Sequence, residues 1–304
     1  MTGNVPKRRG SFLWYNFCHD PMAVVSVGVL ILLLFGAVLA VWIAPQNPFD
    51  PASLNLMNSF YPPVWMEGGQ LSHVLGTDDQ GRDLFSAILY GTRVSLIVGM
   101  GAVTLSVIVG VSIGLLAGYA GGWTEALLMR AADVQLTVPA ILIALMIDGF
   151  ARAALPSAVH EDIVLYVLIF SIGIADWPQY ARVVRSATLR ERVAGYVAAA
   201  RVIGVAPAAI VLRHIVPNVI TPVLVLAALG LALAVIAEAT LSFLGVGMPA
   251  TTPSLGTLIR VGNDYLFSGE WWIILFPSLT LVLLALSVNV LGDWMRAALS
   301  PRLR

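Results

Sequence analysis

Several apolar runs in this chain exceed about eighteen residues, and this feature constrains its fold most. At about 1.5 Å per residue, such a run crosses the hydrocarbon core of a bilayer as one α-helix. The chain has 304 residues, of which 59% are hydrophobic and 11% are charged. These fractions lie far outside the composition of soluble domains. We therefore expect an all-α polytopic membrane protein.

The apolar runs predict six transmembrane helices. They are Ala23–Ala44, Val94–Tyr119, Leu127–Ile147, Ile163–Ile174 extending to Tyr180, Val219–Ala237 continuing towards Phe243, and Ile273–Leu291. A cleaved signal peptide is the alternative for the first run, but the run is longer than the apolar core of a signal. We therefore expect an uncleaved first span.

The positive charges predict the orientation of these spans. Six spans place both chain ends on one side, and four of the seventeen Lys and Arg residues, Arg82, Arg93, Arg152 and Arg260, then lie on the opposite side. The other thirteen lie on the side of the termini. Because cytoplasmic loops carry the excess of Lys and Arg, both termini are expected in the cytoplasm.

The predicted organisation follows from these spans. We expect a basic and aromatic cytoplasmic tail (1–22), the first span (23–44), an extracytoplasmic segment (45–90), a five-helix core (91–296) containing a cytoplasmic loop (181–216), and a cytoplasmic tail (297–304).

The residue types also exclude several kinds of chemistry. Lys7 is the only lysine, so no G-x-x-x-x-G-K-[ST] phosphate loop can form and the chain cannot hydrolyse ATP by that route. Cys18 is the only cysteine, and the four histidines are too scattered to indicate a metal site. We expect no metal, no cofactor and no nucleic-acid partner.

Two other function classes each require a signal in the sequence. A membrane-embedded hydrolase needs a Ser–His or metal constellation at membrane depth, whereas all four histidines are predicted in tails and loops. A secondary transporter or channel usually shows a row of intramembrane ionisable residues or inverted repeats. Neither is evident here, so the residues favour neither class.

The most polar part of the chain is Trp177–Pro217, which holds six of the seventeen basic residues. Each Arg would cost roughly 2.5 kcal/mol or more at the bilayer centre, so this stretch is expected in the cytoplasm. Ala198–Ala200 predicts the start of a short helix, Gly204 its stop, and Pro207 the first turn of a second helix. The small side chains favour a docking element for another protein; a solvated basic loop that only sets topology is the alternative.

The spacing of this helix-turn-helix resembles the EAA loop of ATP-binding cassette (ABC) importer permeases. Ala199 and Ala200 match the two alanines, Gly204 the glycine and Pro217 the closing proline, whereas Ala198 replaces the family glutamate and Val216 replaces leucine. The resemblance implies that a coupling helix here contacts the ATPase. The coupling residues it implies are Ala198, Ala199, Ala200, Arg201, Gly204, Pro207, Arg213 and Pro217.

A second motif, HVLGTDDQGRDLFSAILYGTRVSL, ends the predicted outer segment. Its glycines permit a tight turn and its charges can pair; the spacing of a calcium-binding EF-hand is absent. The candidate residues are Gly76, Thr77, Asp78, Gly81, Arg82 and Asp83. The motif resembles the dipeptide/oligopeptide/nickel class of ABC permeases, and PPVWMEGG at 62–69 resembles dipeptide permeases in particular. The run LSFLGVGMPATTPSLG at 241–256 and the C-terminal GDWMRAALSPRLR fit the same class, with Ser300 where aspartate is usual.

Three charged residues within the predicted spans are candidates for a structural or pathway role. Arg130 and Asp133 are three residues apart on one helical face, and we expect them to neutralise each other. Glu238 is expected near the outer end of its helix, where it either attracts the ammonium end of a peptide or has an interhelical partner. Asp148 and Asp176 are expected at the membrane interface.

The resemblance implies the type I ABC importer (MetI-like) permease fold in a bacterial inner membrane. It implies transport of short peptides, dipeptides first, by alternating access; oligopeptides, glutathione and nickel remain alternatives. The implied partners are a homologous second permease, two ATPase subunits that bind ATP and magnesium, an extracytoplasmic peptide-binding protein and the lipid bilayer.

Overall fold

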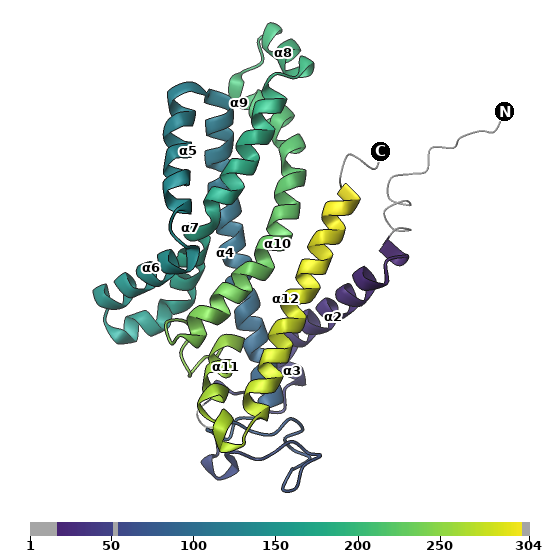
Figure 1. The fold of residues 1–304 in the computed structure, drawn as a ribbon, viewed down its shortest axis with the longest axis vertical. Helices are drawn as coiled ribbons and strands as arrows, with labels where there is room; N and C mark the ends of the chain where they lie inside the picture. The colour runs from purple at the N-terminus through teal and green to yellow at the C-terminus, as the bar shows by residue number, and fades with distance from the viewer. Residues whose placement is uncertain (1–16, 51–53, 300–304) are drawn as a thin grey trace, which may run out of the picture.

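The computed structural model describes residues 17–50 and 54–299 and is almost entirely helical (Figure 1). The principal helices are α2 (Pro21–Val38), α3 (Ala40–Ile43), α4 (Leu84–Ala120), α5 (Gly122–Leu136), α6 (Ala140–Ala154), α7 (Ser157–Arg192), α8 (Gly195–Val202), α9 (Pro207–Ile210), α10 (Val216–Phe243), α11 (Leu255–Asp264) and α12 (Trp272–Leu299). Short turns are the 3-10 helices η2 (Leu56–Asn58) and η4 (Leu266–Ser268) and the π-helix η3 (Val211–Ile215). The predicted all-α class is confirmed.

The long helices run between two opposite ends of the molecule. Helix α8 lies at one end, and the loops between α3 and α4 lie at the other, beside α11 (Figure 1). The end with α8 is called the inner end below, and the opposite one the outer end. Most of the predicted tails, 1–22 and 297–304, lies outside the described residues, so their predicted location is not tested.

The helices long and apolar enough to cross a membrane coincide with four of the six predicted spans. Within the described residues these are Pro21–Val38, Leu84–Ala120, Pro207–Phe243 and Trp272–Ala298, or five spans if the bent pair α5–α6 counts as one. Helix α7 encloses the predicted fourth span, Ile163–Ile174. The multi-span architecture is confirmed, whereas the number of six crossings stays a prediction.

The predicted third span, Leu127–Ile147, is wrong as a single straight helix. The chain bends by 89° between α5 and α6. The break falls at Thr137–Pro139, where Pro139 precedes the first residue of α6 with an extended backbone. Because proline has no N–H and disfavours a helical conformation in the residue before it, the helix ends here although the apolar pattern continues.

Helices α4 and α7 pack along their length through glycines. A Cβ at Gly110 would lie 2.7 Å from the Trp177 carbonyl oxygen, and one at Gly114 would lie 2.6 Å from that of Ala181. Such distances are shorter than side chains allow, so the two backbones touch because these positions lack a side chain. The close packing of α4 on α7 therefore depends on glycine at these two positions.

A proline inside α7 creates a free carbonyl that a neighbouring helix satisfies. Pro178 has no N–H to donate to the carbonyl of Ile174, four residues earlier. Gln135 of α5 donates from Nε2 to that oxygen at 2.6 Å, and its Oε1 accepts from Trp177 Nε1 at 3.0 Å. An unpaired carbonyl is costly in lipid, so Gln135 both satisfies α7 and ties it to α5.

Candidate functional site

The predicted helix-turn-helix at the inner end is present. Helix α8 begins at Gly195, three residues before the predicted start at Ala198. It ends where predicted: Gly204 has φ +80°, its N–H donates to the Arg201 carbonyl at 3.1 Å, and the Val205 N–H donates to the Ala200 carbonyl at 3.0 Å. This is the Schellman arrangement, which needs a left-handed residue and therefore favours glycine.

The second helix of the motif also begins where predicted. Pro207 is the first residue of α9, a position where its missing N–H costs nothing. The chain then widens into the π-helix Val211–Ile215, which ends two residues before Pro217. In a continuous α-helix the ring of Pro217 would clash with the Arg213 carbonyl, and the wider turn gives it room. The helix-turn-helix therefore merges into α10 without a loop.

Helix α8 has one buried and one exposed face. Val197 and Ala200 are 0% and 5% exposed and pack on a core formed by α7, η3 and α10. The remaining predicted coupling residues, Ala198, Ala199, Arg201, Gly204, Pro207, Arg213 and Pro217, are exposed. Arg201 lies over the Tyr119 ring, 5.6 Å from its centroid.

Large apolar side chains stand on the exposed side of this motif. Val202 is 87% exposed, Ile203 78%, and Val193, at the start of the motif, 81%. Exposed apolar residues grouped on a short polar loop, with arginines beside them, are typical of a protein interaction surface rather than of a freely solvated loop. This observation favours the docking interpretation of the motif.

The outer motif folds into a buried turn at the start of α4. Asp78 accepts from Arg82 Nε at 2.6 Å and from the Arg82 backbone N–H at 2.9 Å, and both side chains are 1% exposed. The Arg82 Nη1 donates to the Ala250 carbonyl at 2.7 Å. A buried ion pair with additional hydrogen bonds fixes geometry, so the pair joins this turn to the segment between α10 and α11.

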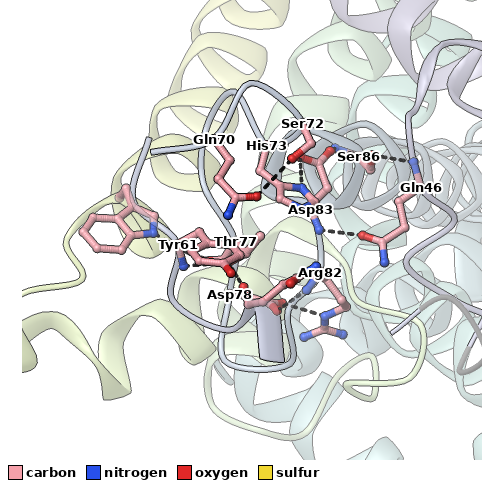
Figure 2. Close-up of polar contacts among 12 residues, drawn as sticks. Gln46, Tyr61, Gln70, Ser72, His73, Thr77, Asp78, Arg82, Asp83 and Ser86 are labelled. Carbon is pink, nitrogen blue, oxygen red and sulfur yellow. Dashed lines mark hydrogen bonds and ion pairs between the residues drawn. The ribbon is translucent and has the colours of Figure 1, made fainter. Parts of the chain in front are cut away.

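Asp83 is the N-terminal cap of α4. Its Oδ2 accepts from the Ser86 N–H at 2.8 Å and from Ser86 Oγ at 2.6 Å, and its own N–H donates to Gln46 Oε1 at 2.8 Å (Figure 2). The His73 ring lies beside its other oxygen, with Nδ1 3.4 Å from Oδ1. An aspartate at this position satisfies a free N–H and favours the helix dipole.

Thr77 completes the turn. Its hydroxyl donates to the Asn58 carbonyl at 2.6 Å and accepts from the Tyr61 N–H at 2.8 Å, and its carbonyl accepts from Trp272 Nε1 at 3.2 Å. The glycines are also required here: Gly76 and Gly81 have φ of +86° and +73°, and a Cβ would meet a backbone oxygen at 2.5 and 2.1 Å. The predicted charged turn is therefore present, and the side chains of Thr77, Asp78 and Asp83 are used for contacts within the protein.

A second acidic residue, Asp79, lies at the edge of this pair, with its Oδ1 4.0 Å from Arg82 Nη2. Burial raises the pKa of the Asp79 carboxyl, and the negative charge of Asp78 raises it further. The charge of Asp79 in turn contributes most to a raised pKa of the Tyr265 phenol. A carboxylate in this position costs free energy when ionised. Among the described residues no group of three or more His, Cys, Asp or Glu side chains could hold a metal ion.

The predicted pairing of Arg130 with Asp133 is replaced by a contact between helices. Asp133 accepts from Arg182 of α7 at 2.5 Å, and Arg130 is exposed. A second pair joins Glu125 of α5 to Arg185, with Nε 2.7 Å from Oε1. Because α7 packs beside α5, Asp133 and Glu125 of α5 each pair with an arginine of α7. The spacing of residues within α5 cannot predict these pairs.

Glu238 has the interhelical partners that were one of its two predicted roles. It is 0% exposed, and its carboxylate accepts from Ser95 of α4 at 2.6 Å and from Ser242 at 2.7 Å. Since the carboxylate is enclosed, it joins α4 to α10 near the outer end and is not presented to a solute.

A group of three polar side chains that local sequence spacing does not reveal in full lies between α6 and α7. Asp148 is 0% exposed, accepts from Arg152 Nε at 2.6 Å, and lies 3.8 Å from His160 Nε2. His160 is buried in the first turn of α7, and His214 lies in the π-helix, so the expectation that all four histidines occupy tails and loops is wrong. The four-residue spacing of Asp148 and Arg152 was the signal for the first pair; nothing local indicated His160.

Comparison with known proteins adds independent findings. A family model described as "Binding-protein-dependent transport system inner membrane component" matches residues 110–304, and one described as "N-terminal TM domain of oligopeptide transport permease C" matches residues 11–63. The chain is 38% identical to the dipeptide transport system permease protein DppC of Escherichia coli K12, over 100% of this chain and 97% of the relative. It is 35% identical to the di/tripeptide transport system permease protein DppC of Pseudomonas aeruginosa, over 96% and 91%, respectively. With the DppC of Haemophilus influenzae the identity is 32%, over 98% and 97%.

Proposed function

Because this chain belongs to the family of inner membrane components of binding-protein-dependent transport systems, we propose that it carries short peptides, dipeptides first, into the cytoplasm. It is a permease subunit of an ABC importer with several membrane-spanning helices, and such a subunit carries no catalytic site of its own. The observation that carries the substrate proposal is the likeness to dipeptide permeases over essentially the whole chain.

The partners follow from this assignment. Energy comes from two ATPase subunits that bind ATP and magnesium, since the single lysine, Lys7, excludes a phosphate loop in this chain. A homologous permease completes the pathway, and an extracytoplasmic binding protein delivers the peptide. Because the relatives are named as dipeptide and di/tripeptide permeases, di- and tripeptides are the first candidates, ahead of oligopeptides, glutathione and nickel.

The topology belongs to the same proposal. Six crossings with both termini in the cytoplasm place the inner end, with α8, in the cytoplasm and the turn at Gly76–Asp83 outside. The four clear spans, the bent pair α5–α6 and the long α7 support this arrangement.

We assign ATPase docking to α8 and the turn that follows it. The exposed apolar side chains of Val202 and Ile203, beside Arg201, support this role. Closure of the ATPases would push α8, and α7 and α10 would pass the movement to the membrane as rigid bodies. This is alternating access driven from the inner end.

The uptake experiment uses the complete complex in liposomes with its binding protein. Labelled dipeptide is expected to accumulate inside only when ATP is present on the ATPase side. Competition with an unlabelled tripeptide, glutathione or nickel ranks the alternatives. Dipeptide uptake without nucleotide, or ATP-dependent uptake that an excess of dipeptide does not compete, would overturn the proposal.

The docking role is tested with one substitution and a matched control. Ile203→Glu adds a charge to the proposed contact surface at a side chain that is 78% exposed, so the fold should not change. The ATPases are expected to dissociate during purification. Leu71→Glu introduces the same change at the outer end, where Leu71 is 88% exposed, and should leave ATPase binding unchanged. Retention of the ATPases by Ile203→Glu would rule out this contact.

A further inference from the structure

Three polar side chains from three helices meet beside α8. Glu191 lies in the last turn of α7, Tyr196 is the second residue of α8, and Asn218 is the third residue of α10. The Tyr196 hydroxyl donates to Glu191 Oε2 and accepts from Asn218 Nδ2 at 2.9 Å. Asn218 Nδ2 also donates to the His214 carbonyl, at 3.0 Å. We call Glu191, Tyr196 and Asn218 the clasp.

Apolar packing alone holds α8 weakly. The helix is eight residues long, and its buried face consists of Val197 and Ala200. Two small or medium side chains bury little area, so they resist rotation of the helix about its axis only slightly. The chain leaves α8 through Gly204, where no atom lies within 4 Å of a would-be Cβ. In this turn only the next residue, Val205, packs partly on the same core.

The clasp adds a hydrogen-bonded restraint to this packing and to the contact of Arg201 with the Tyr119 ring. Tyr196 precedes the buried Val197, so its hydrogen bonds fix the rotation of α8 at the point where its buried face begins. A tyrosine hydroxyl, whose ordinary pKa is about 10, is protonated at physiological pH and is therefore a donor; partial burial and the hydrogen bond to Glu191 raise the Tyr196 pKa further. A hydrogen bond to a charged acceptor is stronger than one between neutral groups.

We propose that the clasp is the positioning device that transmits the movement of α8 to α7 and α10, and so sets how many ATP molecules are used per peptide. This inference rests on the proposed docking of ATPases on α8. When the clasp is intact, displacement of α8 moves both long helices together. When it is broken, α8 follows the ATPases while the membrane helices lag behind, and ATP is hydrolysed without transport.

The test compares ATP hydrolysis with peptide uptake in the complete complex. Tyr196→Phe removes the hydroxyl and keeps the ring. The ATPases should remain bound and hydrolysis should continue, while the ATP used per peptide rises about three- to tenfold, as expected for loss of one partly exposed hydrogen bond to a charged acceptor. Glu191→Gln keeps an acceptor and should retain most of the coupling, whereas Glu191→Ala should not.

The outcomes separate the clasp from the docking proposal. Tyr166→Phe, at a tyrosine of α7 that is 69% exposed, is the matched control and should keep the wild-type ratio. An unchanged ratio in both Tyr196→Phe and Glu191→Ala would overturn the clasp, as would a proportional loss of hydrolysis and uptake. Failure of the docking proposal is seen independently, as normal ATPase binding and uptake by Ile203→Glu.

Discussion

The contact between α4 and α7 allows a quantitative prediction for Gly114→Ala. The added Cβ would lie 2.6 Å from the Ala181 carbonyl oxygen and 2.7 Å from the Val184 Cβ, whereas ordinary contact begins at 3.4 Å. The Ala181 carbonyl oxygen belongs to the backbone and cannot rotate away. The helices must therefore separate by about 0.8 Å to bring its distance from the new Cβ to 3.4 Å. A gap of this size forfeits roughly a quarter to a half of each contact energy along the seam.

The expected net cost is modest and measurable. Overpacking of a close contact costs about 1–3 kcal/mol, and replacing a helical glycine by alanine returns roughly 0.5–1 kcal/mol. Gly114→Ala should therefore destabilise the protein by about 1–2 kcal/mol. On the scaling of soluble domains this lowers the unfolding midpoint by about 2–6 °C, measured by thermal unfolding of the purified protein in lipid nanodiscs.

A glycine without neighbours provides the control for this experiment. Gly28 lies in the middle of α2, and nothing lies within 4 Å of its would-be Cβ. Gly28→Ala should leave the unfolding midpoint unchanged or raise it slightly, because only the higher helix propensity of alanine over glycine remains. An equal response of Gly28→Ala and Gly114→Ala would refute the conclusion that the missing side chain at Gly114 creates the contact.

Three further predictions concern the outer turn and the orientation. Arg82→Met should destabilise the protein by about 3–5 kcal/mol in thermal unfolding, because it leaves the buried Asp78 carboxylate without its partner; Asp78→Asn added to it should restore part of the loss, and no restoration would contradict the pairing. The native Asp79 pKa lies above its ordinary value of 3.8, so the folded protein binds more protons than the unfolded one between these two pKa values, and stability should fall as pH rises through this window. Asp79→Asn should reduce this dependence of stability on pH. A pH dependence that the substitution leaves unchanged would exclude Asp79 as its source. In a cysteine-free background, a cysteine at Ala199 should react with an impermeant thiol reagent from the cytoplasmic side and one at Leu71 from the outer side; the reverse pattern would overturn the topology.

Local sequence signals predicted the elements of the inner end because their causes are local. A left-handed residue is needed where α8 ends, and Gly204 supplies it; a first-turn residue that needs no N–H begins α9, and Pro207 is that residue. The same holds for the outer turn, where Gly76 and Gly81 occupy conformations that favour glycine. The start of α8 lacks such a signal, and it was placed three residues late.

Contacts between distant segments could not be predicted in this way. Arg130 is the nearer partner of Asp133 along the chain, but α7 brings Arg182 within 2.5 Å. The clasp unites residues as far as 27 positions apart, Glu191 and Asn218. The bend between α5 and α6 had a local signal, Pro139, yet the apolar composition on both sides concealed it, because lipid exposure demands the same residues before and after a bend.

The outer end contains a second set of backbone contacts, which bears on how movement crosses the molecule. A Cβ at Gly256 of α11 would meet the Ala239 carbonyl of α10 at 2.3 Å, and one at Gly262 would meet the Ile274 nitrogen of α12 at 2.5 Å. Close-packed interfaces of this kind shift between discrete arrangements and do not deform gradually. Helix α11 therefore holds α10 and α12 in a fixed relation at the outer end, while the close contact at Gly114 holds α4 to α7. In the proposed coupling, a push on α8 that reaches α7 and α10 moves these helices as blocks. A loss of coupling is then expected at α8, where the clasp would be the restraint that fails.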